Sequence, residues 1–447
     1  MSHPPETGAA AAAPPESGLE RSLGPWMIWG LGVGYVISGE YFGWNLGLPE
    51  GGTYGMLAAT ALVTVMYVAF VLSYAEVACA VPRAGGAFVY ADRAFGRDVG
   101  LLVGLAQLVE FVFAPPAIAA AIGAYFHLFV PEMPETLIAV GAYVLFVGLN
   151  IWGVKQSAIF ELVVTVLAVA ELLLFAGVAL PHFDTARFVA DPLPNGWAGV
   201  LPAIPFAIWF YLAIEGVANI AEEARDPQRD IPRGFLYAMG TLVGLAVLVF
   251  FAAVGVDGWH SVVFDAAAEA VDRPLPLALG RIVGENHPLY HLLVTVGLFG
   301  LVASFHGIIL VAGRATLELG RYGVLPRVLG RTHATRHTPV PALLAVLAVG
   351  IAALLTGRTG EIITLSVFGA LVLYIGAMAS RFRLRRTEPE LPRPYRAPLY
   401  PWLPALALVL ALLCLVAVAV SAPRIGAVFV GLMAAGTALG HVLRDRD

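Results

Sequence analysis

Residues 24–48 read GPWMIWGLGVGYVISGEYFGWNLGL, with glycines at positions 30, 32, 34, 39, 43 and 47 and a glutamate, Glu40, inside an otherwise apolar stretch. Each interior glycine disfavours a regular helix by roughly 1 kcal/mol relative to alanine. A carboxylate at membrane depth costs at least about 2.5 kcal/mol more. A span that only anchored the chain would contain neither. We therefore predict a membrane helix broken near Ile37, Ser38 and Gly39, whose freed backbone groups line a cavity. The alternative is close glycine-mediated helix packing, with Glu40 bonded to a neighbouring helix.

The composition of the chain is typical of a membrane protein. Only 13% of its 447 residues are charged, where soluble globular domains carry roughly 25%. Hydrophobic residues make up 59% and the mean hydropathy is +0.82. The two cysteines, Cys79 and Cys414, lie far apart in apolar runs and indicate neither a disulfide framework nor a metal site. These values predict an all-α polytopic membrane protein.

We expect about twelve apolar spans near the roughly 20 residues that cross a bilayer. They lie at 25–48, 54–81, 99–130, 136–153, 157–180, 198–221, 234–256, 288–312, 339–356, 361–380, 401–421 and 424–441. Residues 1–24 lack the charged start and apolar centre of a signal peptide, and we predict a disordered cytoplasmic tail.

The positions of the basic residues predict the orientation of the chain. With the N-terminus inside, the predicted cytoplasmic segments hold 21 of the 26 basic residues. Those left outside are Arg187, Arg273, Arg281, Arg358 and Arg424. Because cytoplasmic loops are enriched in lysine and arginine, both termini are predicted to be cytoplasmic.

The sixth span, LPAIPFAIWFYLAIEGVANIAEE at 201–223, repeats the pattern of the first. Pro202 and Pro205 disturb its first half, aromatic residues crowd its centre, and Glu215 follows. Two interrupted helices five spans apart are typical of inverted five-helix repeats, which bind substrate where the two breaks meet. We therefore predict a first repeat over 25–180, a second over 181–380, and two additional helices with a cytoplasmic tail over 381–447.

Four motifs resemble one known family, the amino acid–polyamine–organocation superfamily. They are ISGEYFG at 37–43, AEVACAVPRAGGAFVYADRAFG at 75–96, AEEARDPQRDIPRG at 221–234 and GRATLELGRYGVLPR at 313–327. They resemble, in order, its first-helix break, its helix 2–3 signature, the loop after its sixth helix and the exit of its eighth. Within that superfamily, GYVISGEYFGWNLGL at 34–48 and EFVFAPPAIA at 110–119 resemble the ethanolamine permeases. The resemblance implies a secondary transporter that imports its substrate by alternating access.

The residue types at the two predicted breaks favour a small amine as substrate. An organic cation in a cavity of low dielectric needs an anion, carbonyl groups or an aromatic face in place of its water. The predicted substrate-binding residues are Ile37, Ser38, Gly39, Glu40, Glu110, Phe206, Trp209 and Phe210. In amino-acid-transporting relatives, backbone amides of helix 1 bind the substrate carboxylate. Because the carboxylate of Glu40 would repel that group, it favours an amine that has no carboxyl group, most specifically ethanolamine. The alternative is that Glu40 points away from the substrate and forms a structural hydrogen bond.

Other ionisable residues in the spans are candidates for coupling and gating. Proton-coupled relatives often place a lysine in helix 5, but the matching position here is Ala168. We predict coupling to protons and name Glu171, one turn further on, and His306 as candidate carriers. Glu76 and Glu215 lie inside family motifs toward the cytoplasmic side and are predicted to hold the inner gate.

Functions of other classes lack supporting motifs. The sequence has no H-E-x-x-H, no G-x-S-x-G and no clustered cysteine and histidine, so we predict that the chain is not an enzyme and has no cofactor or metal. The predicted partners are a small amine, protons and the lipid bilayer of the cell membrane, without nucleic acid. The alternative function is that of an amino-acid/proton symporter or an amino-acid/amine exchanger of the same superfamily.

Overall fold

The computed structural model describes residues 23–83, 85–153, 158–336 and 338–444. Within these ranges the chain is almost entirely helical and forms no β-strand, which confirms the all-α class. Nearly all of the predicted N-terminal tail, and residues 445–447 of the predicted C-terminal tail, lie outside the described ranges.

The helices follow one another with short connections. The first half contains α1 (Pro25–Val36), α2 (Ser38–Tyr41), α3 (Leu48–Ala80), α4 (Ala87–Phe95), α5 (Arg97–His127), α6 (Glu135–Trp152), α7 (Ala158–Ala179) and α8 (Thr185–Phe188). The second half contains α9 (Val200–Trp209), α10 (Pro227–Asp257), α11 (Pro274–Val283), α12 (Pro288–Arg321), α13 (Val340–Leu354), α14 (Thr359–Thr387), α15 (Trp402–Ser421) and α16 (Pro423–Arg444). Five 3₁₀ helices join them: η1 (Trp44–Gly47), η2 (Leu180–His182), η3 (Gly196–Gly199), η4 (Ile214–Glu223) and η5 (Trp259–Val262).

The described helices agree with the predicted membrane spans. Ten of the helical segments in these residues are long and apolar enough to cross a bilayer. The helices at two of the predicted spans are too short to be among these ten. The first is divided between α1 and α2, and the ninth, α13, has 15 residues and a length of about 22 Å at 1.5 Å per residue. The expectation of a polytopic α-helical membrane protein is confirmed.

The first helix is interrupted twice. At Ile37 the hydrogen-bond pattern tightens, because the amide of Glu40 donates to the carbonyl of Ile37 at 3.0 Å. The helix then ends at Phe42, whose backbone is extended, and Gly43 has a φ of 88°, which favours glycine. The predicted break at Ile37–Gly39 therefore disturbs the helix only slightly, because Ile37 keeps a helical backbone conformation. The helix is fully interrupted at Phe42–Gly43. From there η1 leads into α3, whose first turn is interrupted at Gly52 (φ 62°, ψ −169°), between the first two predicted spans.

The sixth helix is interrupted where the sequence predicted it. The α9 segment ends at Trp209, a turn follows, and Ala213 has a φ of 75° in the left-handed region. The chain continues as the 3₁₀ helix η4 rather than as a second α-helix. Its end is tied to the start of the first helix, since the amide of Leu23 donates to the carbonyl of Glu223 at 3.0 Å.

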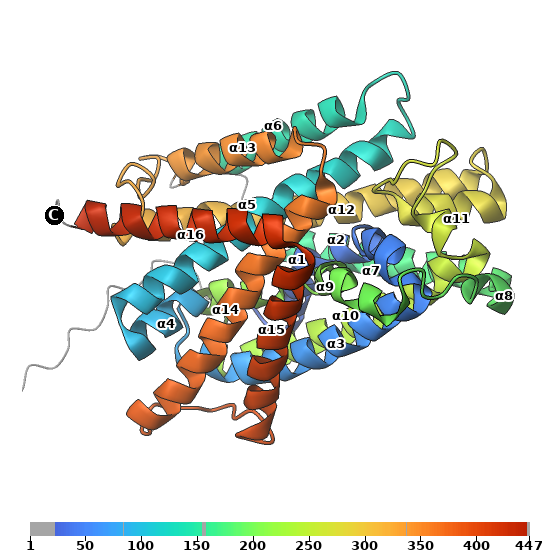
Figure 1. The fold of residues 1–447 in the computed structure, drawn as a ribbon. Helices are drawn as coiled ribbons and strands as arrows, with labels where there is room; N and C mark the ends of the chain where they lie inside the picture. Colours follow the sequence, from blue (N-terminus) through green and yellow to red (C-terminus); the bar gives the residue numbers. More distant parts are fainter. Residues whose placement is uncertain (1–22, 84, 154–157, 337, 445–447) are drawn as a thin grey trace, which may run out of the picture.

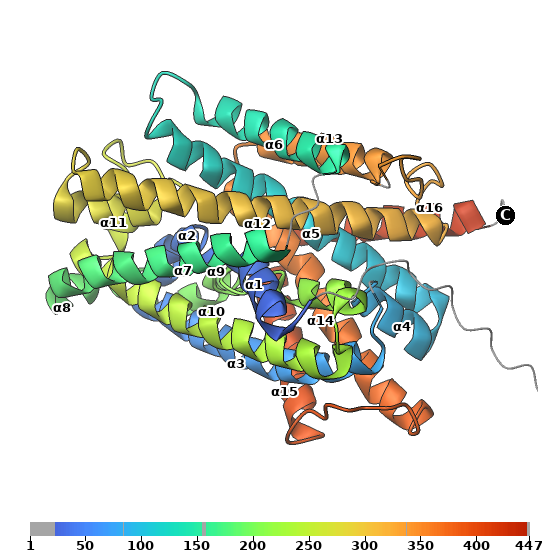
Figure 2. The same cartoon turned by 180° about the vertical axis from the view of Figure 1, so that it is seen from behind.

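The two interrupted helices lie in the middle of the bundle. Figures 1 and 2 show α1, α2 and α9 surrounded by the long helices, with α6 and α13 side by side along one side. The α4 helix and the C-terminal end of α16 lie at one end, and α8 and α11 lie at the other. The relation between spans 1–5 and 6–10 by an inverted repeat stays a prediction.

Three segments differ from the sequence expectation. Residues 87–95 form the short helix α4, and residues 274–283, which lie between the predicted spans 234–256 and 288–312, form α11. Both are short and mostly buried, with Arg93 and Arg281 exposed, and a search for long apolar runs does not detect such helices. The α14 helix continues to Thr387, seven residues past the predicted end at 380.

The two breaks are in direct backbone contact through Gly39. A Cβ added to Gly39 would clash with the carbonyl oxygen of Trp209 and would lie 3.1 Å from its carbonyl carbon and 3.2 Å from the Cα of Phe210. The absence of a side chain at Gly39 is therefore what lets the two interrupted helices meet.

We predict that Gly39→Ala lowers the transport rate by about tenfold or more, because overpacking costs about 1–3 kcal/mol and here pushes the two breaks apart. Gly148→Ala in α6 is the matched control, since an added Cβ there meets nothing within 4 Å. Uptake of radiolabelled substrate into proteoliposomes, normalised to reconstituted protein, measures both variants. Equal rates for Gly39→Ala and Gly148→Ala would contradict the contact.

Candidate functional site

Aromatic rings from both interrupted helices pack together at their contact. The rings of Phe42 and Trp209 meet edge to face with centroids 5.5 Å apart. Those of Trp44 and Phe210 stack at 5.8 Å. All four side chains are buried. The sequence predicted Trp209 and Phe210 at this place, whereas Phe42 and Trp44 were missed because they lie beyond the expected break.

Glu40 is fully buried beside these rings. Its backbone carbonyl accepts a hydrogen bond from the indole nitrogen of Trp44 at 3.2 Å. Neither carboxylate oxygen has a hydrogen-bond partner among the described residues. The indole nitrogen of Trp209 on the opposite break also lacks one in that part of the chain. Unpaired polar groups in an apolar interior cost several kcal/mol, so the contact holds a buried acceptor and a buried donor that are both uncompensated.

The backbone of the first break is held by α12. The hydroxyl of Ser304 donates to the carbonyl of Tyr35 at 2.8 Å and shares a hydrogen bond with the hydroxyl of Ser38 at 2.9 Å. This serine replaces a helical hydrogen bond that the break removes. Ile37, Ser38 and Gly39 are all buried at the centre of the bundle, as the sequence predicted.

Glu110 and Glu215 lie together rather than apart. Glu110 is buried on α5, Glu215 is buried on η4, and their carboxyl groups adjoin each other. Tyr374 on α14 donates to Glu215 Oε2 at 3.0 Å, and its hydroxyl also pairs with that of Tyr67 at 2.9 Å. The sequence assigned Glu110 to the substrate and Glu215 to the gate, and it did not foresee that they are neighbours.

Phe206 packs beside the end of η1 and the start of α14. A Cβ added to Gly47 would lie 3.0 Å from the Cβ of Phe206, and a Cβ added to Gly360 would lie 3.4 Å from its ring.

The two candidate proton carriers occupy different surroundings. Glu171 on α7 accepts a hydrogen bond from the hydroxyl of Tyr41 at 2.7 Å, and Tyr41 directly follows Glu40. His306 on α12 instead faces α6, where its Nδ1 lies 3.0 Å from the amide nitrogen of Asn150. The structure thus brings Glu171 next to the first break and does not bring His306 there.

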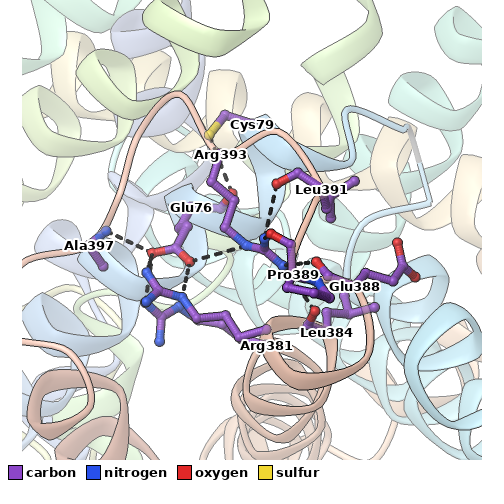
Figure 3. Close-up of polar contacts among 10 residues, drawn as sticks. Glu76, Cys79, Arg381, Leu384, Glu388, Pro389, Leu391, Arg393 and Ala397 are labelled. Carbon is purple, nitrogen blue, oxygen red and sulfur yellow. Dashed lines mark hydrogen bonds and ion pairs between the residues drawn. The ribbon is translucent and has the colours of Figure 1, made fainter.

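Glu76 is the centre of a buried ionic cluster (Figure 3). Arg381 and Arg385 on α14 each donate to its carboxylate at 2.7 Å, and the amide of Ala397 donates at 2.8 Å. Arg393 lies 3.8 Å away and donates to the carbonyl of Leu384 in the last turn of α14 and to those of Pro389 and Leu391 in the segment that follows. The cluster therefore ties α3 to the end of α14 and to the segment that leads to α15.

One further buried carboxylate lies in the first turn of α7. Glu161 is fully buried, and both its oxygens lack partners in the described residues. It packs against Gly34, where an added side chain would meet its carboxylate. A glutamate inside an apolar span was the signal that could have identified it.

Two broken helices with unpaired polar groups at their contact, inside a bundle of long apolar helices, define the chain as a membrane transporter of the interrupted-helix class. It belongs to the amino acid permease family, whose model matches residues 23–437. This membership supports the superfamily indicated by the motifs.

Several characterised and uncharacterised transporters are similar to the chain over most of its length. An uncharacterised transporter of Rhizobium meliloti is 30% identical over 426 residues, which cover 92% of this chain and 88% of that protein. A branched-chain amino acid permease of Bacillus subtilis is 24% identical, with 90% and 89% covered. A low-affinity putrescine importer of Escherichia coli is 27% identical, with 71% and 70% covered.

Glu76→Gln should lower the free energy of unfolding by about 3–5 kcal/mol, because it leaves buried arginines without their carboxylate. Glu388→Gln is the control. Glu388 pairs with Arg93 on the exposed rim, where hydrogen bonds from Arg93 hold the pKa of Glu388 below its usual range. Exposed pairs contribute about 0–1 kcal/mol. Thermal unfolding of the purified protein in detergent compares the two, and equal losses would contradict a buried ionic cluster.

Proposed function

We propose that this protein is a secondary transporter that imports a small organic amine, most specifically ethanolamine, by alternating access and with coupling to protons. We further propose that it lies in the cell membrane with both termini in the cytoplasm. Its substrate would bind where the two interrupted helices meet, beside Glu40 and the rings of Trp209 and Phe210.

One observation supports this proposal above the others. The contact between the breaks leaves one acceptor, the carboxylate of Glu40, and one donor, the indole nitrogen of Trp209, without partners among the described residues. Ethanolamine carries an ammonium group that can donate to a carboxylate and a hydroxyl group that can accept from an indole. Aromatic faces at the same place favour a cation.

The charge of Glu40 argues against a zwitterionic substrate. An amino acid would bring its own carboxylate near that of Glu40. Like charges about 4 Å apart repel by roughly 4 kcal/mol at an effective dielectric of 20, which is a discrimination of about a thousandfold. An amine that has no carboxyl group avoids this repulsion.

The names of the relatives include both substrate classes, an amino acid permease and a putrescine importer. The second candidate function is therefore an amino-acid/proton symporter or an amino-acid/amine exchanger. The unpaired carboxylate of Glu40 favours the amine.

Coupling to protons requires a group that gains and loses a proton within the membrane. Glu171 and His306 are the carriers that the sequence suggests, and Glu171 is the better placed of the two because it contacts Tyr41. The carboxyl pair of Glu110 and Glu215 is a further location.

We expect saturable uptake of ethanolamine into proteoliposomes, strong competition by similar small amines and weak competition by serine or alanine. Glu40→Gln should lower ethanolamine uptake by tenfold or more, because removing a buried charge partner costs about 2–5 kcal/mol. Glu50→Gln, the same substitution at an exposed position of α3, should transport normally. Serine competing as well as ethanolamine, or normal uptake by Glu40→Gln, would favour the amino-acid alternative.

A further inference from the structure

The ionic cluster around Glu76 carries more positive than negative charge. Three guanidinium groups lie 2.7 to 3.8 Å from its single carboxylate, those of Arg381, Arg385 and Arg393. Glu388, at the end of α14, does not offset the excess, because its carboxylate pairs with Arg93. Three positive charges against one negative charge leave the cluster with a net charge of two.

Arg381 is the member of the cluster whose hydrogen-bond donors are incompletely used. Its side chain is 1% exposed, and one terminal nitrogen donates to Glu76 at 2.7 Å. Its Nε and its other terminal nitrogen, Nη1, have no partner among the described residues. The ring of Tyr400 lies 5.1 Å from the guanidinium carbon, which gives a cation–π contact but no acceptor in the guanidinium plane. Buried donors of a charged group are costly to leave unpaired, so Arg381 lacks an acceptor.

A small hollow adjoins these donors. It is lined by Arg381 and Leu384 of α14, by Leu391 and Arg393 of the segment that follows, and by the end of α3 that carries Glu76. The hollow therefore lies where α3, α14 and this segment meet, and two arginines line it. The planar, forked donors of a guanidinium group match the oxygen atoms of a phosphate.

The segment 388–401 and the first residue of α15 have the features of a membrane interface. Leu399 and Trp402 are 73% and 77% exposed, and tryptophan is enriched where a membrane meets water. Figures 1 and 2 show this segment projecting sideways from the bundle rather than from either of its ends. Arg386 and Arg396 are exposed nearby. Basic pockets between helices on the cytoplasmic side bind the headgroups of anionic lipids, and this end of α14 is predicted to be cytoplasmic.

We propose that Arg381 and the arginines beside it bind a phosphate group, and that the source of this group is an anionic lipid of the surrounding bilayer. The phosphate accepts hydrogen bonds from Nε and Nη1 of Arg381 and offsets the excess positive charge. The acyl chains lie outside the bundle along Leu399 and Trp402. The bound lipid and Glu76 together hold α3, α14 and the segment 388–401 in place. This site is separate from the contact of the two interrupted helices and does not depend on which substrate is transported.

Lipid binding to the purified full-length protein tests the proposal. The protein is delipidated in a neutral detergent and titrated with phosphatidylglycerol or phosphatidylcholine, and native mass spectrometry measures the apparent Kd of each lipid. Both lipids carry a phosphate, but only phosphatidylglycerol has a net negative charge. It should therefore bind wild type about tenfold or more tightly than phosphatidylcholine. Equal affinity for the two lipids would overturn the proposal, and this comparison needs no variant.

Arg381→Lys isolates the guanidinium donors. Lysine keeps a charge that can pair with Glu76 but lacks the planar fork, so this variant should weaken the binding of phosphatidylglycerol by about tenfold or more. Arg386→Lys is the matched control at an exposed position of the same helix and should bind as wild type does. A cooperative thermal unfolding transition checks that both variants fold. Unaltered affinity in Arg381→Lys, or equal losses in the two variants, would overturn the proposal.

Inorganic phosphate distinguishes the source of the phosphate group. Phosphatidylglycerol should raise the Tm of wild type and of Arg386→Lys more than that of Arg381→Lys, and inorganic phosphate alone should leave all three unchanged. A rise in the Tm of wild type with inorganic phosphate, lost in Arg381→Lys, would support the phosphate site and overturn the lipid as its source. If neither compound raises the Tm of wild type, the bound lipid does not hold these segments together and the proposal is wrong.

Discussion

The contact of Gly39 with the carbonyl group of Trp209 is the constraint on which the arrangement of the site depends. Inside a bilayer every backbone polar group needs a partner within the protein, so an interrupted helix is tolerated only where neighbouring groups replace its lost hydrogen bonds. Ser304 does this for the first break by donating to the carbonyl of Tyr35. Because the two breaks meet at a glycine, four aromatic rings and one carboxylate are brought together at the centre of the bundle.

The buried carboxylates divide into two groups according to their partners. Glu76 is bonded by two arginines and a backbone amide, so its charge is compensated and it holds helices together. The carboxylates of Glu40, Glu110 and Glu161 have no such partner among the described residues. A charge without compensation at membrane depth is costly and is usually retained for function. This difference separates Glu76, which has a structural role, from Glu40, which is proposed to bind the amine.

Much of the fold could be predicted because long apolar runs, and the glycines and prolines that interrupt them, are local signals. The break after Trp209 was found from Pro205 and the aromatic residues around it. The clustering of side chains was harder to predict, because it depends on which helix faces which. Nothing local indicates that Glu110 adjoins Glu215, or that Arg381 lies beside Glu76, 305 positions earlier. His306 was named from the sequence as a candidate proton carrier, and only the structure shows that its ring contacts Asn150 on α6.

The central claim is that the substrate binds between the two interrupted helices with its ammonium group on Glu40. A structure of the full-length protein determined by electron cryomicroscopy with ethanolamine bound tests this most directly. The account predicts density for the ligand between the first and sixth helices, with its nitrogen at hydrogen-bonding distance from the carboxylate of Glu40 and its hydroxyl toward the indole nitrogen of Trp209. Ligand density elsewhere in the bundle, or a Glu40 carboxylate turned away from the bound amine, would contradict it.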